Sequence, residues 1–135
     1  MPHDTFDQQL QELPAFRALL RAVEVDFYAD LPMTAPVLDL GCGDGHFATV
    51  AFDHKLDVGL DPWAKPLREA RTHGAYRILT HADGARMPFS DAHFATIVSN
   101  SVLEHIPNVE PVVREVARVL RPGGAFYFCV PGPNF

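Results

Sequence analysis

The sequence predicts an α/β domain in which a parallel, doubly wound sheet is covered by helices. Strand-like apolar runs alternate with amphipathic helical segments along the chain, which is typical of a parallel sheet with right-handed crossovers. A second observation is a buried strand over 37–40 that leads into the turn Gly41-Cys42-Gly43-Asp44-Gly45, which opens a helix. At 135 residues, 47% of them hydrophobic, the chain forms one domain, 1–135, with a single core.

Residues 1–35 are predicted to be a helical segment within this domain. Phe16, Leu19, Leu20, Val23 and Phe27 recur at helical i, i+3, i+4 intervals. Pro14 is expected in the first turn, where its missing N–H costs nothing.

Helices and strands alternate over the rest of the chain, with helices expected over 45–53, 63–73 and 108–120 and strands over 56–60, 76–80, 94–99 and 125–130. Gly74 is expected to close the second of these helices as a C-cap. Pro122-Gly123-Gly124 is expected to stop the third. Residues 81–93 are predicted to form an irregular loop between the third and fourth strands.

The glycine turn indicates the kind of ligand. It should present unoccupied backbone N–H groups at the carboxyl edge of the sheet, where α/β proteins hold nucleotide-like ligands. Its spacing is G-x-G-x-G rather than the G-x-G-x-x-G of dinucleotide sites, and no Lys-Ser or Lys-Thr pair follows as in a P-loop. Asp39 and Asp44 flank the turn, and their charge favours a cationic ligand such as S-adenosylmethionine over a pyrophosphate. The alternative is a tight strand–helix turn that binds nothing.

The pattern Asp39-x-Gly41-x-Gly43-x-Gly45 resembles motif I of the class I S-adenosylmethionine-dependent methyltransferases. From about residue 37 to 130 the chain is most similar to the small-molecule branch that includes the ubiquinone-biosynthesis type. The resemblance implies a Rossmann-like sheet of about five strands in the order 3-2-1-4-5. It also implies S-adenosylmethionine as the cofactor and S-adenosylhomocysteine as the product.

The resemblance further implies a cofactor site formed by Asp39, Gly41, Cys42, Gly43, Gly45, Asp61, Pro62, Trp63, Asp83, Gly84, Ala85 and Asn100. In it, Asp39 is directed toward the ammonium group, Asp61 accepts from the ribose hydroxyls, and Asp83 accepts from the adenine amine. Pro62 or Trp63 covers a face of the adenine. From the residues alone, Asp61 could instead cap the next helix, Asp83 could lie in a surface turn, and Trp63 could anchor the core.

Glu104 and His105 are the titratable pair that follows the fourth strand, where the methyl group would lie. His105 is a candidate base because the unperturbed pKa of histidine suits removal of a proton from an acceptor, and a capping or hydrogen-bonding role is the alternative. No Asn-Pro-Pro-Tyr or Asp-Pro-Pro-Tyr follows this strand. The resemblance therefore indicates methyl transfer to O, C or N atoms of small-molecule acceptors.

Composition excludes several other classes. The net charge of −6 argues against non-specific nucleic-acid binding, and no apolar run reaches the length of a membrane span. The N-terminus lacks a signal-peptide pattern. Cys42 and Cys129 lie in unlike contexts, so a cytoplasmic location without disulfides is expected. The seven histidines show no zinc spacing, and no metal is expected.

The family's sheet has two further strands after the fifth, whereas this sequence ends at Phe135. We expect the chain to be the cofactor-binding core of a longer enzyme, with its fifth strand as a bare apolar edge through which it forms a homo-oligomer. One alternative is a non-catalytic S-adenosylmethionine-binding module or partner subunit. Another is a nicotinamide-dependent oxidoreductase, which the glycine spacing and Asp39 disfavour.

Overall fold

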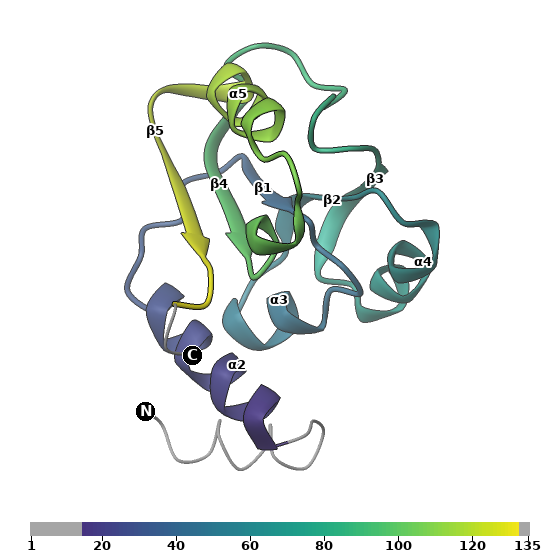
Figure 1. Cartoon of the computed structure of the whole chain (residues 1–135), viewed down its shortest axis with the longest axis vertical. Helices are drawn as coiled ribbons and strands as arrows, with labels where there is room; N and C mark the ends of the chain where they lie inside the picture. The colour runs from purple at the N-terminus through teal and green to yellow at the C-terminus, as the bar shows by residue number, and fades with distance from the viewer. Residues whose placement is uncertain (1–14, 133–135) are drawn as a thin grey trace.

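The computed structural model describes residues 15–132, which form a five-stranded sheet with helices on both faces (Figure 1). The strands are β1 (Val37–Leu40), β2 (Leu56–Asp61), β3 (Tyr76–His81), β4 (Phe94–Asn100) and β5 (Leu120–Cys129). Their spatial order is β3-β2-β1-β4-β5, and every neighbouring pair is parallel. The predicted fold and strand order are confirmed.

Each face of the sheet carries its own apolar core. Helices α2 (Ala15–Tyr28), α3 (His46–Ala51) and α4 (Ala64–His73) contribute to one, and α5 (Glu110–Val119) with the loop 82–93 contributes to the other. Val37 belongs to the first core and Leu38 to the second, as the alternation of side chains along a strand requires. Leu38 and Ile97 are fully buried, and burying each contributes roughly 1.5–3 kcal/mol.

Helix α2 does not bury most of the larger apolar side chains whose spacing predicted it. Leu19, Val23 and Phe27 are 38%, 46% and 47% exposed, whereas Ala18 and Ala22 are fully buried. Both stripes have helical spacing, and the alanines face the core because their small side chains allow a close approach. Pro14 lies outside the described residues, and only the backbone of Phe16 is described.

The boundary between α5 and β5 also departs from the prediction. The helix ends at Val119, and Leu120 is already extended and paired with Phe94 of β4. The Pro-Gly-Gly sequence therefore lies inside β5, at a register irregularity, and does not stop the helix. Gly124 is required there because a Cβ would lie 2.8 Å from the carbonyl oxygen of Ala95. By contrast, Gly74 closes α4 in the left-handed conformation as predicted.

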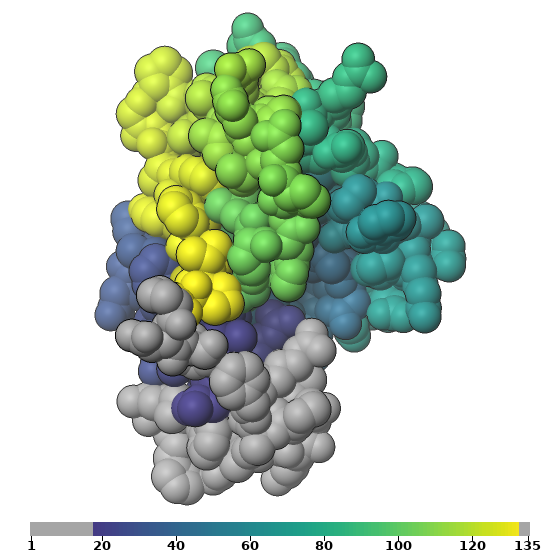
Figure 2. Space-filling model, viewed as in Figure 1, coloured from purple at the N-terminus to yellow at the C-terminus, as the bar shows by residue number. Residues whose placement is uncertain are grey.

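Helical segments lie at the carboxyl ends of the strands. The carboxyl ends of β4 and β5 point toward α2, which lies across that edge of the sheet (Figure 1). A short 3-10 helix, η1 (Leu103–His105), follows β4 at the same edge. β5 is an edge strand with Phe128 exposed, and it lies beside α5 on the face seen in Figure 2.

Candidate active site at the carboxyl edge of the sheet

The glycine turn follows β1 directly, and its three glycines all have positive φ: 75° at Gly41, 56° at Gly43 and 78° at Gly45. L side chains rarely adopt this conformation. At Gly41 a Cβ would lie 2.6 Å from the Val102 side chain, so this glycine is needed for packing. At Gly43 a Cβ would meet nothing within 4 Å, so this position faces open space where a ligand can approach.

Three backbone N–H groups of the turn, those of Gly41, Cys42 and Gly43, are already occupied, contrary to the prediction. Gly41 and Cys42 both donate to the Leu60 carbonyl, at 2.8 and 2.9 Å, and Gly43 donates to Asp61 Oδ2 at 3.0 Å. The reason is the register: β1 and β2 are neighbours, so the end of β2 lies within hydrogen-bonding reach of the turn. These groups are not available to an anion, which makes the turn a poor pyrophosphate site.

A cavity of about 720 Å³ opens beside the turn, bounded by α2, the glycine turn, α3, α4 and the segment after β4. Its lining consists of Leu20, Arg21, Glu24, Asp39, Gly41, Cys42, Gly43, Asp44, Phe47, Pro66, Glu69, Asn100, Ser101, Val102, Glu104, His105 and Pro131. Four carboxylates other than that of Asp39 therefore share the cavity with one guanidinium. Of the predicted site residues, Asp39, Gly41, Cys42, Gly43, Asn100, Glu104 and His105 are brought together here, whereas Gly45 lies outside the lining.

Asp39 is the buried acid of this cavity, with only 6% of its surface exposed. Burial, together with the nearby Asp61 charge, raises the pKa of its carboxyl to about 6, against the lowering effects of a hydrogen bond from the Tyr76 hydroxyl and of the Arg21 charge. Burial and the Asp39 charge likewise raise the pKa of Tyr76, which therefore stays protonated and donates. A cationic ligand beside Asp39 would stabilise the ionised form of this buried carboxyl.

Helix α2 supplies two charged residues that the sequence analysis missed. Glu24, 4% exposed, accepts hydrogen bonds from Asn100 Nδ2 and Ser101 Oγ, both at 2.5 Å. The Arg21 guanidinium lies 5.1 Å from the centre of the Phe47 ring. The only sequence signal was an acid beside the buried alanine stripe, and it became meaningful only once the helix face was known.

The segment after β4 is held in an uncommon conformation. Ser101 has φ 54°, and its N–H donates to the Cys129 carbonyl at 2.8 Å. Non-glycine residues with positive φ are often found at functional sites. Asn100 Oδ1 is buried and has no hydrogen-bond partner among the residues that the structure describes, so within them the amide retains an unused acceptor beside the cavity.

Glu104 and His105 lie on η1 at the mouth of the cavity. Glu104 Oε1 is 3.6 Å from His105 Nε2, and the histidine side chain is largely exposed. A protonated imidazole would be attracted to the carboxylate at this distance. The pair is thus open to solvent on one side and to the cavity on the other.

Asp61, Pro62 and Trp63 lie at the same edge of the sheet but outside the cavity lining. Asp61 is buried, and its Oδ1 accepts from the Trp63 N–H at 3.0 Å, which is the local bond of the capping alternative. The Pro62 carbonyl accepts from His81 Nε2 at 2.9 Å. Trp63 is 70% exposed, so its alternative role as a core anchor is wrong.

Asp83, Gly84 and Ala85 form a turn next to Asp61, in which Asp83 is exposed and the other two residues are half-buried. Asp83 Oδ1 accepts from the Ala85 N–H at 2.9 Å, and the Ala82 N–H donates to the Asp61 carbonyl at 3.2 Å. Asp83 thus bonds within its own turn, and the pairing of β2 with β3 brings this turn to the edge that carries the glycine turn.

Two classes of feature are not found in the described range. Across residues 15–132, no three His, Cys, Asp or Glu side chains gather closely enough to hold a metal ion. No helix in that range is long and apolar enough to cross a membrane. Cys42 and Cys129 are free thiols.

Comparisons with known proteins agree on one family. The family model for the methyltransferase domain matches residues 38–128. Ubiquinone biosynthesis O-methyltransferase of Pectobacterium atrosepticum is 35% identical over 104 residues, covering 73% of this chain and 43% of that protein. The 27-O-demethylrifamycin SV methyltransferase of Amycolatopsis mediterranei is 31% identical over 118 residues, covering 76% and 43%.

The fold comparison gives the same picture. The PH0226 protein from Pyrococcus horikoshii superposes with a TM-score of 0.73 at 25% identity, covering 90% of this chain and 57% of that one. The chain spans less than half the length of the two curated relatives.

Proposed function

Because the chain belongs to the methyltransferase-domain family, we propose that it binds S-adenosylmethionine at the carboxyl edge of its sheet, as the core of an enzyme that methylates a small-molecule O, C or N acceptor. The observation that carries this proposal is the cavity beside Gly43, where an open glycine and a buried acid meet. Pyrophosphate would be repelled by these acids, whereas a ligand with an ammonium and a sulfonium would be attracted.

The residues present fit the amino-acid end of this cofactor. The ammonium group needs acceptors, and Asp39, Glu24 and the unused Asn100 Oδ1 lie around the cavity. The carboxylate of the ligand needs a cationic partner, and Arg21 provides a guanidinium in the cavity lining. Gly43 provides the space in which the chain of the ligand can pass close to the backbone.

The adenosine end would extend from this cavity toward the ends of β2 and β3. Asp61 would accept from the ribose hydroxyls, with Gly43 N–H already fixing one of its oxygens. Asp83 would accept from the adenine amine, and Trp63 with Pro62 would cover one face of the ring. The exposure of Trp63 leaves an aromatic surface free for such stacking.

S-adenosylmethionine supplies a methyl group that is already activated on a sulfonium. The chain must therefore bind and align, and exclude water from the reacting atoms. His105 would accept the acceptor's proton at Nδ1, and Glu104 Oε1 lies 3.6 Å from its Nε2. Arg21 and the buried acids would hold the amino-acid end in one orientation, which fixes the direction of the methyl group.

We also propose that β5 pairs with a second copy of the chain. It is an edge strand, and the rings of Phe126 and Phe128 lie 5.1 Å apart along it, with Phe128 exposed. Light scattering should report a dimer at micromolar concentration, and Phe128→Lys should shift it to a monomer. A monomeric wild-type chain would contradict this proposal.

Calorimetric titration with S-adenosylhomocysteine, with NADH as the control, tests the cofactor proposal. We expect micromolar binding of the first and none of the second. Binding of NADH alone, or of neither ligand by a folded chain, would refute it. Binding without methyl transfer to any small-molecule acceptor, in a longer version of the protein as well, would favour a non-catalytic S-adenosylmethionine-binding module.

A further inference from the structure

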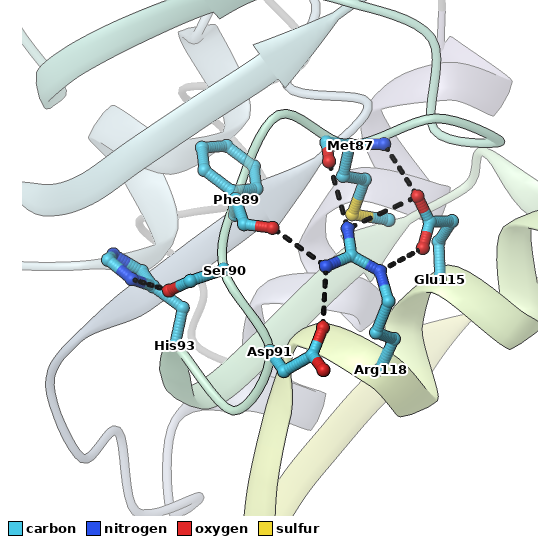
Figure 3. Close-up of polar contacts among 7 residues, drawn as sticks. All are labelled: Met87, Phe89, Ser90, Asp91, His93, Glu115 and Arg118. Carbon is cyan, nitrogen blue, oxygen red and sulfur yellow. Dashed lines mark hydrogen bonds and ion pairs between the residues drawn. The ribbon is translucent and has the colours of Figure 1, made fainter.

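Arg118 near the end of α5 makes an unusually complete set of hydrogen bonds (Figure 3). Its Nη1 donates to the Phe89 carbonyl at 2.8 Å and to Asp91 Oδ1 at 2.9 Å, and its Nη2 donates to the Met87 carbonyl at 2.9 Å. Nε and Nη2 donate to the two carboxylate oxygens of Glu115, at 2.5 and 3.3 Å. All five N–H donors of the guanidinium are therefore used.

These contacts fasten the loop 82–93 to α5, and we call Arg118 with Glu115 the clamp. Glu115 Oε1 also accepts from the Met87 N–H at 2.9 Å, so both backbone groups of Met87 are held by the clamp. The hydrogen bond from Arg118 lowers the pKa of Glu115, which keeps the carboxylate ionised. A lysine could not reproduce this set of hydrogen bonds, because its ammonium group is a single point charge without the planar geometry of a guanidinium.

The clamp is connected to the turn that carries Asp83 through the neighbouring residue Arg86. Met87 follows Arg86, whose N–H donates to the Asp83 carbonyl at 3.0 Å. At its other end the turn is tied to β2 by the Ala82 N–H on the Asp61 carbonyl. Position 84 packs tightly as well, since a Cβ there would lie 3.1 Å from Leu40. The turn is thus held on one side by the end of β2 and on the other by the segment that the clamp fixes.

We propose that Arg118 is a positioning residue for the adenine end of the cofactor site: by fixing Met87 it fixes the place of the Asp83 carboxylate. This inference rests on the proposed function. Arg118 does not line the cavity, and it contacts the loop rather than any ligand-facing residue. Its loss should therefore impair recognition of the adenine amine more than binding of the amino-acid end.

Arg118→Lys tests the proposal, with Arg114→Lys as the matched control. Arg114 lies on the same helix and pairs with Glu110 on the surface, its side chain 77% exposed. Calorimetry would compare S-adenosylhomocysteine with S-inosylhomocysteine, which lacks the exocyclic amine. The wild-type chain should prefer the adenine ligand. Arg118→Lys should reduce that preference by about tenfold, and Arg114→Lys should leave it unchanged.

The ratio of the two affinities separates positioning from general weakening. Global destabilisation lowers both affinities together and leaves the ratio intact, whereas a displaced Asp83 changes the ratio. In the background Asp83→Asn, the effect of Arg118→Lys on the ratio should disappear. Should Arg118→Lys fail to fold, Glu115→Gln removes one arm of the clamp and should move the ratio in the same direction.

A folded Arg118→Lys chain with an unchanged ratio would overturn the inference alone, because the wild-type chain still binds the cofactor. Persistence of the effect in Asp83→Asn would overturn it too. Failure of the wild-type chain to bind S-adenosylhomocysteine would overturn the proposed function, and this inference with it.

Discussion

The two ends of the proposed cofactor site are built in different ways. At the amino-acid end, Asp39 and Glu24 are almost completely buried and line a cavity that α2 helps to close. At the adenosine end, Asp83 and Trp63 are exposed, and the local bonds of two turns hold them. Glu24 reaches Asn100 across 76 positions of sequence, whereas Asp83 contacts a residue two positions away.

This difference predicts how each end discriminates between ligands. Buried charges interact strongly because water does not screen them, whereas exposed charges contribute much less. We therefore expect affinity to depend mainly on the closed end. The open end should provide a smaller, more easily altered preference for adenine.

The largest effect is expected at Gly43. Gly43→Val would fill the open space beside the turn and should lower affinity for S-adenosylhomocysteine by about a hundredfold or more, comparable with overpacking of a core. Gly74→Val is the matched control, because Gly74 also has positive φ and open surroundings but lies outside the cavity lining. Equal affinity losses in the two variants would mean that backbone strain, not ligand space, is responsible.

Asp61 is the next test, since it joins the two ends. Asp61→Ala should weaken S-adenosylhomocysteine binding by roughly 1–3 kcal/mol, the scale for losing charged hydrogen bonds. Asp57→Ala, on the same strand, also removes a carboxylate that accepts from a backbone N–H, at Val37. Calorimetry should find near-normal affinity in that control. Unchanged affinity in Asp61→Ala would refute the ribose assignment.

Asp39 makes the closed end dependent on pH. Its pKa of about 6 means that the free protein loses this charge below pH 6, so affinity for a cationic ligand should fall about tenfold between pH 7 and pH 5. The Asp39→Asn variant should bind weakly with little pH dependence.

Stability of the free protein should change in the opposite direction. The folded-state pKa of Asp39 lies above the ordinary value of 3.8, so the folded state holds the proton more tightly. This group therefore contributes more stability as pH falls from 7 toward 4, and its contribution is lost as pH rises through about 6. Thermal unfolding of the wild-type chain and of the Asp39→Asn variant at pH 7 and pH 5 measures this contribution to stability. Parallel pH curves for the two proteins would contradict the Asp39 prediction.

The smallest effect is expected at the open end. Trp63→Ala should weaken S-adenosylhomocysteine binding only about threefold, in keeping with one exposed stacking contact. Trp63 is the single tryptophan of the chain, so its fluorescence should also respond to the ligand. A loss as large as that in Gly43→Val would show that the adenosine end is not open in solution.

Local sequence patterns predicted the elements and the turns well. The run from Val37 to Gly45 specified a strand, a turn with positive φ and a helix, because only glycine tolerates that backbone. Gly74 ended its helix for the same reason. The occupied N–H groups of the glycine turn could not be foreseen, because their acceptors, Leu60 and Asp61, belong to another strand.

Helix α2 illustrates the limit more sharply. Two stripes on it had helical spacing, and the larger apolar side chains were the natural choice for the core. The structure buries Ala18 and Ala22 instead. The same orientation of the helix about its own axis brings Arg21 and Glu24 to the cavity.

The sequence by itself determined the fold class and the glycine turn, because periodicity and backbone conformation are encoded by neighbouring residues, and its resemblance to a known family implied the strand order. Only the tertiary structure decided which face of α2 is buried, which acids are shielded from water and which hydrogen-bond donors remain. Those properties depend on contacts between distant segments, where small differences in packing choose between faces that look alike in sequence.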